Sequence, residues 1–227
     1  LKQEVGILHR EASEHEPIGF EEDVHPDILV LAGQDRLSDW GSLGQGQKAP
    51  MQRIAVVGSP GSGKTTVARE LADRLHLPHI ELDAIFHKPG WEPLPDDEFA
   101  DRVDAAVAED RWITDGNYQR VSRPIIWPRA DTVVFLDLPK RTIMHALLKR
   151  SVRRSWRREE LWNGNREQFR NFVKPKPKDN LLIWAWTRSD GYRTRYLDAM
   201  QNPEFAHIDF VQLRSRAEVA NWLEQWN

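Results

Sequence analysis

The chain has 227 residues, of which 40% are hydrophobic, and it contains no cysteine. This length suits one α/β domain of about 180 residues with an appendage, and the lack of cysteine excludes disulfides, thiol nucleophiles and cysteine-based zinc sites. The formal net charge of −3 is unevenly divided, because residues 1–50 carry ten Asp/Glu against four Lys/Arg and residues 51–227 are mildly basic.

Residues 1–50 read as an acidic N-terminal extension. It contains one short apolar run at residues 28–31 and ends in a stretch rich in Gly and Gln at residues 41–50, a composition typical of a linker. Whether the extension is disordered stays open, and we expect the compact domain to occupy residues 51–227. Neither a membrane span nor a signal peptide is visible in the sequence, so we expect a cytoplasmic protein without membrane contact.

After residue 51, predicted strands alternate with predicted helices. Apolar or β-branched runs predict strands at residues 54–57, 79–83, 111–115, 132–138 and 210–213. Apolar residues at helical spacing predict helices after Lys64 and at residues 96–109 and 216–226. This alternation predicts βαβ units and a parallel sheet, and therefore an α/β fold.

The glycine-rich turn after the first strand is the most specific motif in the chain. Its spacing, Gly58-x-x-x-x-Gly63-Lys64-Thr65, matches the phosphate-binding loop of P-loop proteins. Glycines let main-chain N–H groups approach an anion, and the helix that follows adds the positive end of its dipole. We expect Lys64 to contact the β- and γ-phosphates of ATP and the Thr65 hydroxyl to ligate Mg²⁺. The predicted nucleotide-binding residues in this loop are Gly58, Ser59, Pro60, Gly61, Ser62, Gly63, Lys64, Thr65 and Thr66.

Three aspartates stand at the carboxyl ends of predicted strands, where parallel sheets bind their ligands. Asp115 is predicted to hold Mg²⁺ after the third strand. Asp83 follows the second strand, and we expect it to contact an acceptor hydroxyl, take its proton or help to hold the metal. Asp137 precedes Leu-Pro, and we expect it only to cap the following turn.

A strongly basic helix is predicted after the fourth strand. Residues 140–158 include eight Lys/Arg and no acidic residue, and spacings of three and four place Arg150, Arg153, Arg154 and Arg157 on one face. Such a face can close over a triphosphate and stabilise the charge of the transferring phosphoryl group, so Arg153 and Arg157 are candidate catalytic residues. A solvated face or a surface for nucleic-acid phosphates is the alternative, which we do not favour beside the phosphate-binding loop.

The residues around these motifs resemble the P-loop kinases of the adenylate and shikimate kinase type, and most specifically the adenylate-kinase-related DNA topology modulation proteins. The resemblance covers essentially all of residues 51–227 and rests on residues 54–66, 79–86, 88–91, 115–118, 135–139, 160–167 and 213–216. It implies a P-loop NTPase three-layer sandwich whose five-stranded parallel sheet has the order 2-3-1-4-5, with a helical lid at about residues 140–180. It also implies that the loop with Arg214 forms the adenine-side wall.

One departure from that family concerns the acceptor. Adenylate kinases continue the Asp-Gly after their third strand with Phe-Pro-Arg, which helps to bind the monophosphate, whereas this chain continues with Asn117-Tyr118-Gln119-Arg120. The departure argues against AMP as the acceptor unless Arg120 or Arg123 replaces the missing contact.

These observations predict a kinase that transfers a phosphoryl group from ATP, with Mg²⁺, to a nucleotide or another small hydroxyl or phosphate acceptor. Its predicted catalytic residues are Lys64, Asp83, Asp115, Arg153 and Arg157. Two alternatives remain: a nucleotide-gated nucleic-acid-binding or regulatory protein that transfers nothing, and a simple ATPase. The sequence shows no DNA-reading module and leaves the acceptor and the oligomeric state open.

Overall fold

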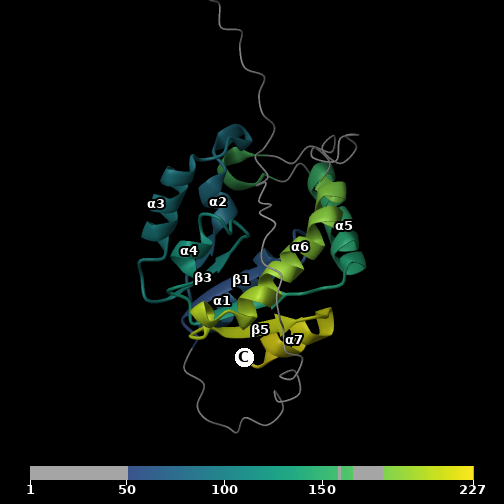
Figure 1. Ribbon diagram of the computed structural model, residues 1–227. Coiled ribbons are helices and arrows are strands. Elements are labelled where there is room, and N and C mark those ends of the chain that lie inside the picture. The colour runs from purple at the N-terminus through teal and green to yellow at the C-terminus, as the bar shows by residue number, and fades with distance from the viewer. Residues whose placement is uncertain (1–50, 158–159, 166–180, 227) are drawn as a thin grey trace, which may run out of the picture.

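The structure is a computed structural model that describes residues 51–157, 160–165 and 181–226 (Figure 1). In these residues five strands form one parallel sheet with the order β2-β3-β1-β4-β5. The strands are β1 (Arg53–Gly58), β2 (His79–Glu81), β3 (Trp112–Asp115), β4 (Thr132–Leu136) and β5 (Asp209–Leu213). The predicted strand order and the P-loop NTPase fold are therefore confirmed. The predicted extension at residues 1–50 lies outside the described residues.

Helices cover both faces of the sheet, and each face has its own apolar core. The helices α1 (Lys64–Leu75) and α7 (Arg216–Glu224) cover one face, whereas α3 (Asp96–Ala106), α4 (Arg123–Ile126) and α6 (Leu181–Gln201) cover the other. Successive side chains of a strand point to opposite faces. Ile54 and Val56 of β1 accordingly join the first core, and Ala55 and Val57 join the second.

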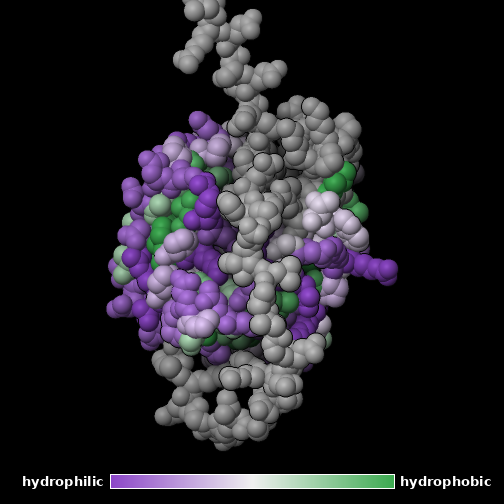
Figure 2. Space-filling model, in the orientation of Figure 1, coloured by the Kyte–Doolittle hydropathy of each residue, from purple (hydrophilic) through white to green (hydrophobic). Residues whose placement is uncertain are grey.

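The basic helix α5 (Lys140–Arg157) follows β4 and lies beside α6 (Figure 1). Part of its surface is apolar, because Leu148, Val152 and Trp156 are exposed at a spacing of four residues. In Figure 2 a small hydrophobic area lies over this helix pair, and a second one lies on the opposite side of the view, over the region of α3 and α4. In the part of the chain that the structure describes, no helix combines the length and apolar character of a membrane span.

The largest local difference from the sequence prediction follows β2. This strand ends at Glu81, and the chain enters a short helix, α2 (Leu82–Phe86), so that Asp83 lies in a helical turn rather than on a strand. Leu82 is buried directly under Gly116, where a Cβ atom added to the glycine would lie 2.8 Å from the Leu82 Cβ. This close approach fixes α2 against the end of β3. The short helices η1 (Pro89–Trp91), η2 (Trp162–Gly164) and η5 (Pro203–Phe205) complete the described fold.

We predict that Gly116→Ala destabilises the fold more than Gly90→Ala. Both glycines have a positive φ, 148° and 80°, but an added Cβ at Gly90 meets no atom within 4 Å. The control therefore carries only the strain of alanine at a positive φ, about 1 kcal/mol, whereas Gly116→Ala also forces Leu82 to move and loses about 2–4 kcal/mol. Urea denaturation measures both values, and equal losses would contradict the proposed contact.

Candidate functional site

The loop between β1 and α1 forms a compact turn in which Ser59 and Ser62 are buried. Its main chain is held by a hydrogen bond from the Ser62 N–H to the Ser59 carbonyl, 3.0 Å. Gly63 precedes the first residue of α1 with φ 98°, and a Cβ added there would lie 2.9 Å from the Arg216 Nη1 atom. The Ser62 Oγ atom is buried and has no hydrogen-bond partner among the described residues. The loop thus has a glycine with a positive φ, the guanidinium group of Arg216 beside it and a buried Ser62 hydroxyl without a hydrogen-bond partner among the described residues.

Lys64 is the partly buried cation of this loop. Its Nζ atom donates to the Ser59 carbonyl at 3.4 Å. Burial lowers the pKa of Lys64, and the negative charges of Asp83 and Asp115 partly oppose that effect, while the positive charge of Arg150 reinforces it. The lysine therefore lies within electrostatic reach of two predicted catalytic carboxylates and of one arginine from α5.

The side chains of α1, β2 and β3 meet at Asp115. Its Oδ2 atom accepts a hydrogen bond from the Thr65 hydroxyl at 2.5 Å, and its Oδ1 atom lies 2.9 Å from His79 Nε2. The Asp115 side chain is only 5% exposed, so both contacts compensate a carboxylate that water scarcely reaches. The two residues predicted to hold metal are therefore brought together. His79 was not predicted, because no sequence motif links it to a residue 36 positions away.

Asp83 faces an aromatic wall. Its Oδ1 atom accepts a hydrogen bond from the Tyr118 hydroxyl at 2.6 Å. The ring of Tyr118 in turn packs against Phe86 and Phe99, with ring centroids 4.6 and 4.9 Å away. The sequence placed Tyr118 next to the Asp-Gly of β3 but gave no reason to pair it with Asp83.

A second side chain after β3 connects the loop to α6. Asn117 donates to the Gly58 carbonyl at 2.7 Å and accepts from the Tyr196 hydroxyl at 3.1 Å. Burial raises the pKa of Tyr196, so its hydroxyl stays protonated and remains a donor. Asn117 thus links the Gly58 carbonyl, at the start of the phosphate-binding loop, to Tyr196 on α6, a helix that is distant in sequence.

Residues 160–165, which follow the basic helix, return to the region around α2 and η1. Trp162 donates through Nε1 to Glu81 at 2.7 Å, and Asn163 donates to the His87 carbonyl at 2.5 Å. Asn165 accepts from the Trp91 N–H and donates to the Lys88 carbonyl, both at 2.9 Å. Two sequence segments that were noted separately, 88–91 and 160–167, therefore lie against each other over the described part.

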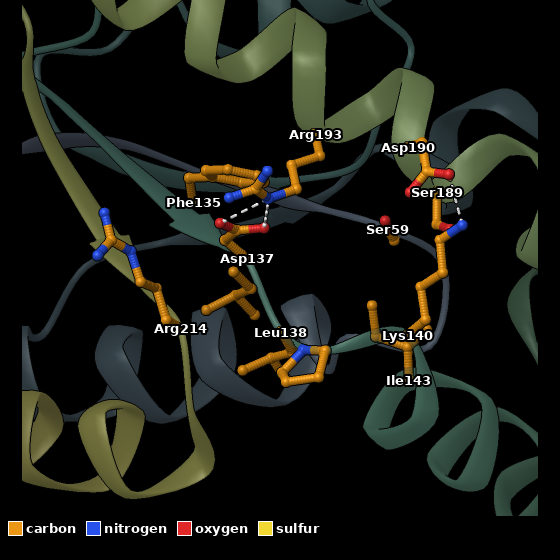
Figure 3. Close-up of a pocket in the computed structure, with 12 residues that line it drawn as sticks. Ser59, Phe135, Asp137, Leu138, Lys140, Ile143, Ser189, Asp190, Arg193 and Arg214 are labelled. Carbon is orange, nitrogen blue, oxygen red and sulfur yellow. Dashed lines mark hydrogen bonds and ion pairs between the residues drawn. The ribbon is translucent and has the colours of Figure 1, made fainter. Parts of the chain in front are cut away.

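A pocket of about 300 Å³ lies beside Ser59 of the loop, next to the segment that follows β4 (Figure 3). It is lined by Ser59, Phe135, Leu136, Asp137, Leu138, Pro139, Lys140, Ile143, Ser189, Asp190, Arg193 and Arg214. Arg214 was predicted on this side, and its Nη2 atom donates to Gln212 Oε1 at 2.9 Å. The pocket lies at the carboxyl ends of β4 and β5, beside Ser59 of the phosphate-binding loop, where parallel sheets bind their ligands.

Asp137 has a different role from the predicted turn cap. Its carboxylate accepts from Arg193 Nε at 3.0 and 3.1 Å and from Gln212 Nε2 at 2.7 Å. The side chain therefore ties β4 to α6 and β5 at the wall of the pocket. A second ion pair, Lys140 to Asp190 at 2.5 Å, joins α5 to α6 nearby (Figure 3).

The arginines of α5 are placed unequally. Arg150 interacts with Lys64, whereas Arg153 belongs to the exposed residues of the helix. The side chain of Arg157 lies outside the described part of the structure. The catalytic roles predicted for Arg153 and Arg157 stay predictions.

Comparison with known proteins identifies a family. Residues 54–171, just over half of the chain, match the family model described as an AAA domain. The chain belongs to that family. Among curated proteins, the chain is 27% identical to adenylate kinase 1 from Nostoc sp., a match that covers 55% of this chain and 82% of the relative. It is 43% identical to a shikimate kinase from Enterococcus faecalis over 20% of this chain and 27% of the relative.

A solved structure of a sugar kinase from Janibacter sp. is similar over 78% of this chain and 92% of its own, with 20% identity and a TM-score of 0.42. The resemblance to P-loop kinases of the adenylate and shikimate kinase type is confirmed at family level. The same relatives support a nucleotide or small-molecule phosphotransferase at that level, with nucleotide binding through the P-loop.

We predict that His79→Ala lowers the free energy of unfolding by about 1–3 kcal/mol, because it leaves the Oδ1 atom of buried Asp115 without its donor. The variant His79→Gln retains an N–H donor and should lose less than half as much. Guanidinium denaturation of both variants gives the comparison. Equal destabilisation by Ala and Gln would assign the effect to packing instead of to the hydrogen bond.

Proposed function

We propose that the protein is a Mg²⁺-dependent phosphotransferase that uses ATP. The observation that carries this proposal is the partly buried ammonium group of Lys64, which lies in a glycine-rich loop within electrostatic reach of Asp83, Asp115 and Arg150. A partly desolvated cation of this kind is stabilised by a polyanion. When bound, ATP would supply the phosphoryl group that is transferred, and Mg²⁺ would neutralise part of its negative charge.

The donor atoms around Thr65 fit Mg²⁺. A hydroxyl and a carboxylate are hard oxygen ligands, and Mg²⁺ in such sites commonly takes only one or two protein ligands beside phosphates and water. In the described residues no cluster of three or more His, Asp or Glu side chains forms a metal cage elsewhere. We therefore assign Thr65 and Asp115 to the metal and His79 to holding the carboxylate in place.

The remaining groups divide between the two substrates. The pocket with Arg214 suits the base of the nucleotide, because it adjoins the phosphate-binding loop at Ser59. Asp83 suits the acceptor, since its carboxylate lies within electrostatic reach of Lys64 from the side of α2. Its hydrogen bond to Tyr118 orients that carboxylate, which is then placed to accept the proton of an acceptor hydroxyl.

We predict that Lys64→Ala lowers phosphoryl transfer by about 10²–10³-fold, because it removes the cation that stabilises charge on the transferring group. The assay incubates the full chain with γ-labelled ATP, Mg²⁺ and a panel of metabolites, and follows the label into products. Undiminished transfer by Lys64→Ala would contradict the assignment of this residue. Hydrolysis of ATP without transfer to any acceptor would instead identify a simple ATPase.

We also predict that binding of ATP takes up protons. Burial lowers the pKa of Lys64 in the free protein, and the phosphates of bound ATP raise it again by opposite charge. Proton uptake should therefore grow as the pH rises towards the lowered pKa and disappear above the pKa of the complex. Calorimetric titration in buffers of different ionisation enthalpy measures it. Lys64→Met, at nucleotide concentrations that still saturate the site, should abolish the uptake, and uptake unchanged in this variant would contradict the prediction.

A further inference from the structure

We propose that the phosphoryl acceptor is an uncharged hydroxyl compound, such as a nucleoside or a neutral sugar, and not a nucleoside monophosphate. This inference rests on the proposed function and concerns the acceptor side of the same site. It follows from the charges around Asp83 once Lys64, which lies within electrostatic reach of that carboxylate, is assigned to the phosphates of ATP.

A phosphorylated acceptor needs cations. A phosphate monoester carries a charge of about −1.5 to −2 at neutral pH, and proteins bind it with arginine and lysine side chains whose charge is available. Besides Lys64, the cations in the described part of helix α1 and of the segments that follow α2 and β3 include Arg69, Lys88 and Arg120. Each is already held by a carboxylate: Arg69 by Glu81 at 2.7 Å, Lys88 by Glu98 at 3.7 Å and Arg120 by Asp96.

The two arginines that could have replaced the missing monophosphate contact have other partners. Arg120 pairs with Asp96 on α3. Arg123 stacks on the rings of Trp127 and Phe205, with its Cζ atom 4.3 and 4.7 Å from the ring centroids. Its guanidinium group thus stabilises the contact between α4 and η5 and does not contribute a phosphate ligand in this arrangement.

The ring cluster next to Asp83 adds no positive charge. His87 lies between two tryptophans, with ring centroids 5.2 Å from Trp91 and 6.4 Å from Trp162. Burial lowers the pKa of His87, against the opposing effect of Asp83, so the imidazole is neutral at physiological pH. The acceptor side therefore offers one carboxylate, a tyrosine hydroxyl and flat apolar rings.

Those groups match a neutral hydroxyl compound. Tyr118 occupies Oδ1 of Asp83, and within the described residues no hydrogen bond reaches Oδ2. A hydroxyl group of the acceptor can donate to that oxygen, whereas a phosphate dianion would be repelled by it. As the acceptor oxygen bonds to the γ-phosphorus, the bond from that phosphorus to the β,γ-bridging oxygen breaks and ADP leaves. The hydroxyl proton passes to Asp83 and then to solvent.

Matched pairs of compounds test the inference. The full chain is incubated with ATP, Mg²⁺ and either a neutral compound or its monophosphate: adenosine, cytidine, guanosine, uridine, glucose and ribose, each beside its phosphorylated form. We expect transfer to a neutral member with a kcat/KM at least about tenfold above that for its monophosphate, because like charges disfavour the latter. Faster transfer to any monophosphate overturns the inference and leaves the proposed function intact.

If no compound in the set is phosphorylated, the binding of nucleoside monophosphates tests the inference instead. AMP, CMP, GMP and UMP are titrated calorimetrically into the full chain saturated with Mg²⁺ and a non-hydrolysable ATP analogue, so that the phosphate-binding loop is filled. Absence of saturable binding supports the inference, and one-to-one binding of a monophosphate overturns it. Failure of the proposed function differs, because the ATP analogue itself then does not bind.

Two variants separate the roles of the acceptor-side residues. Arg120→Gln removes an exposed ion pair and should leave kcat/KM for the acceptor within about twofold. Asp83→Asn removes both the proton acceptor and the negative charge, so it should lose transfer to the neutral compound and bind the monophosphates at least about tenfold more tightly in the calorimetric titration. A large loss in Arg120→Gln with a monophosphate, or an unchanged affinity of Asp83→Asn for the monophosphates, contradicts the inference.

Discussion

The arrangement of this protein depends on a partly buried positive charge. Lys64 is placed at the start of α1 by a glycine turn, and its ammonium group donates to a carbonyl oxygen of the loop itself. Desolvation of an ammonium group is costly, so opposite charges must compensate it. The carboxylates of Asp83 and Asp115 do so only partly, since the pKa of Lys64 is still lowered by burial. A bound anion would therefore stabilise the charged form of Lys64.

The parallel sheet explains why these groups meet. The carboxyl ends of β1 and β3 lie side by side, which brings Asp115 to Thr65, and β4 and β5 end beside the same loop at the pocket. Segments after β3 then hold the parts together: Asn117 fixes the loop to α6, and Tyr118 fixes Asp83 to the aromatic wall. In the function that we propose, Lys64 is the positive centre of the site, Asp115 lies on the metal side and Asp83 on the acceptor side.

Much of the fold could be predicted from the sequence because its signals are local. The spacing of Gly58, Gly63 and Lys64 and the flanking apolar runs define strand, turn and helix without knowledge of the rest. The helix α2 was missed because the run after His79 has too few residues to show a helical period, and its position depends on the contact of Leu82 with Gly116. His79 and Tyr118 gain their roles from partners that lie 36 and 35 residues away, and sequence spacing carries no signal for such pairs. The partners of Arg120 and Arg123 were likewise decided by tertiary packing.

The central claim is that the loop before Lys64 binds a polyphosphate. Equilibrium dialysis of the full chain against labelled Mg·ATP tests it most directly, with inorganic tripolyphosphate as the competitor. The account predicts saturable binding of one ATP per chain and its displacement by tripolyphosphate, because the main-chain amides and the lysine recognise phosphate charge. Absence of saturable binding, or binding that tripolyphosphate leaves unchanged, would contradict it.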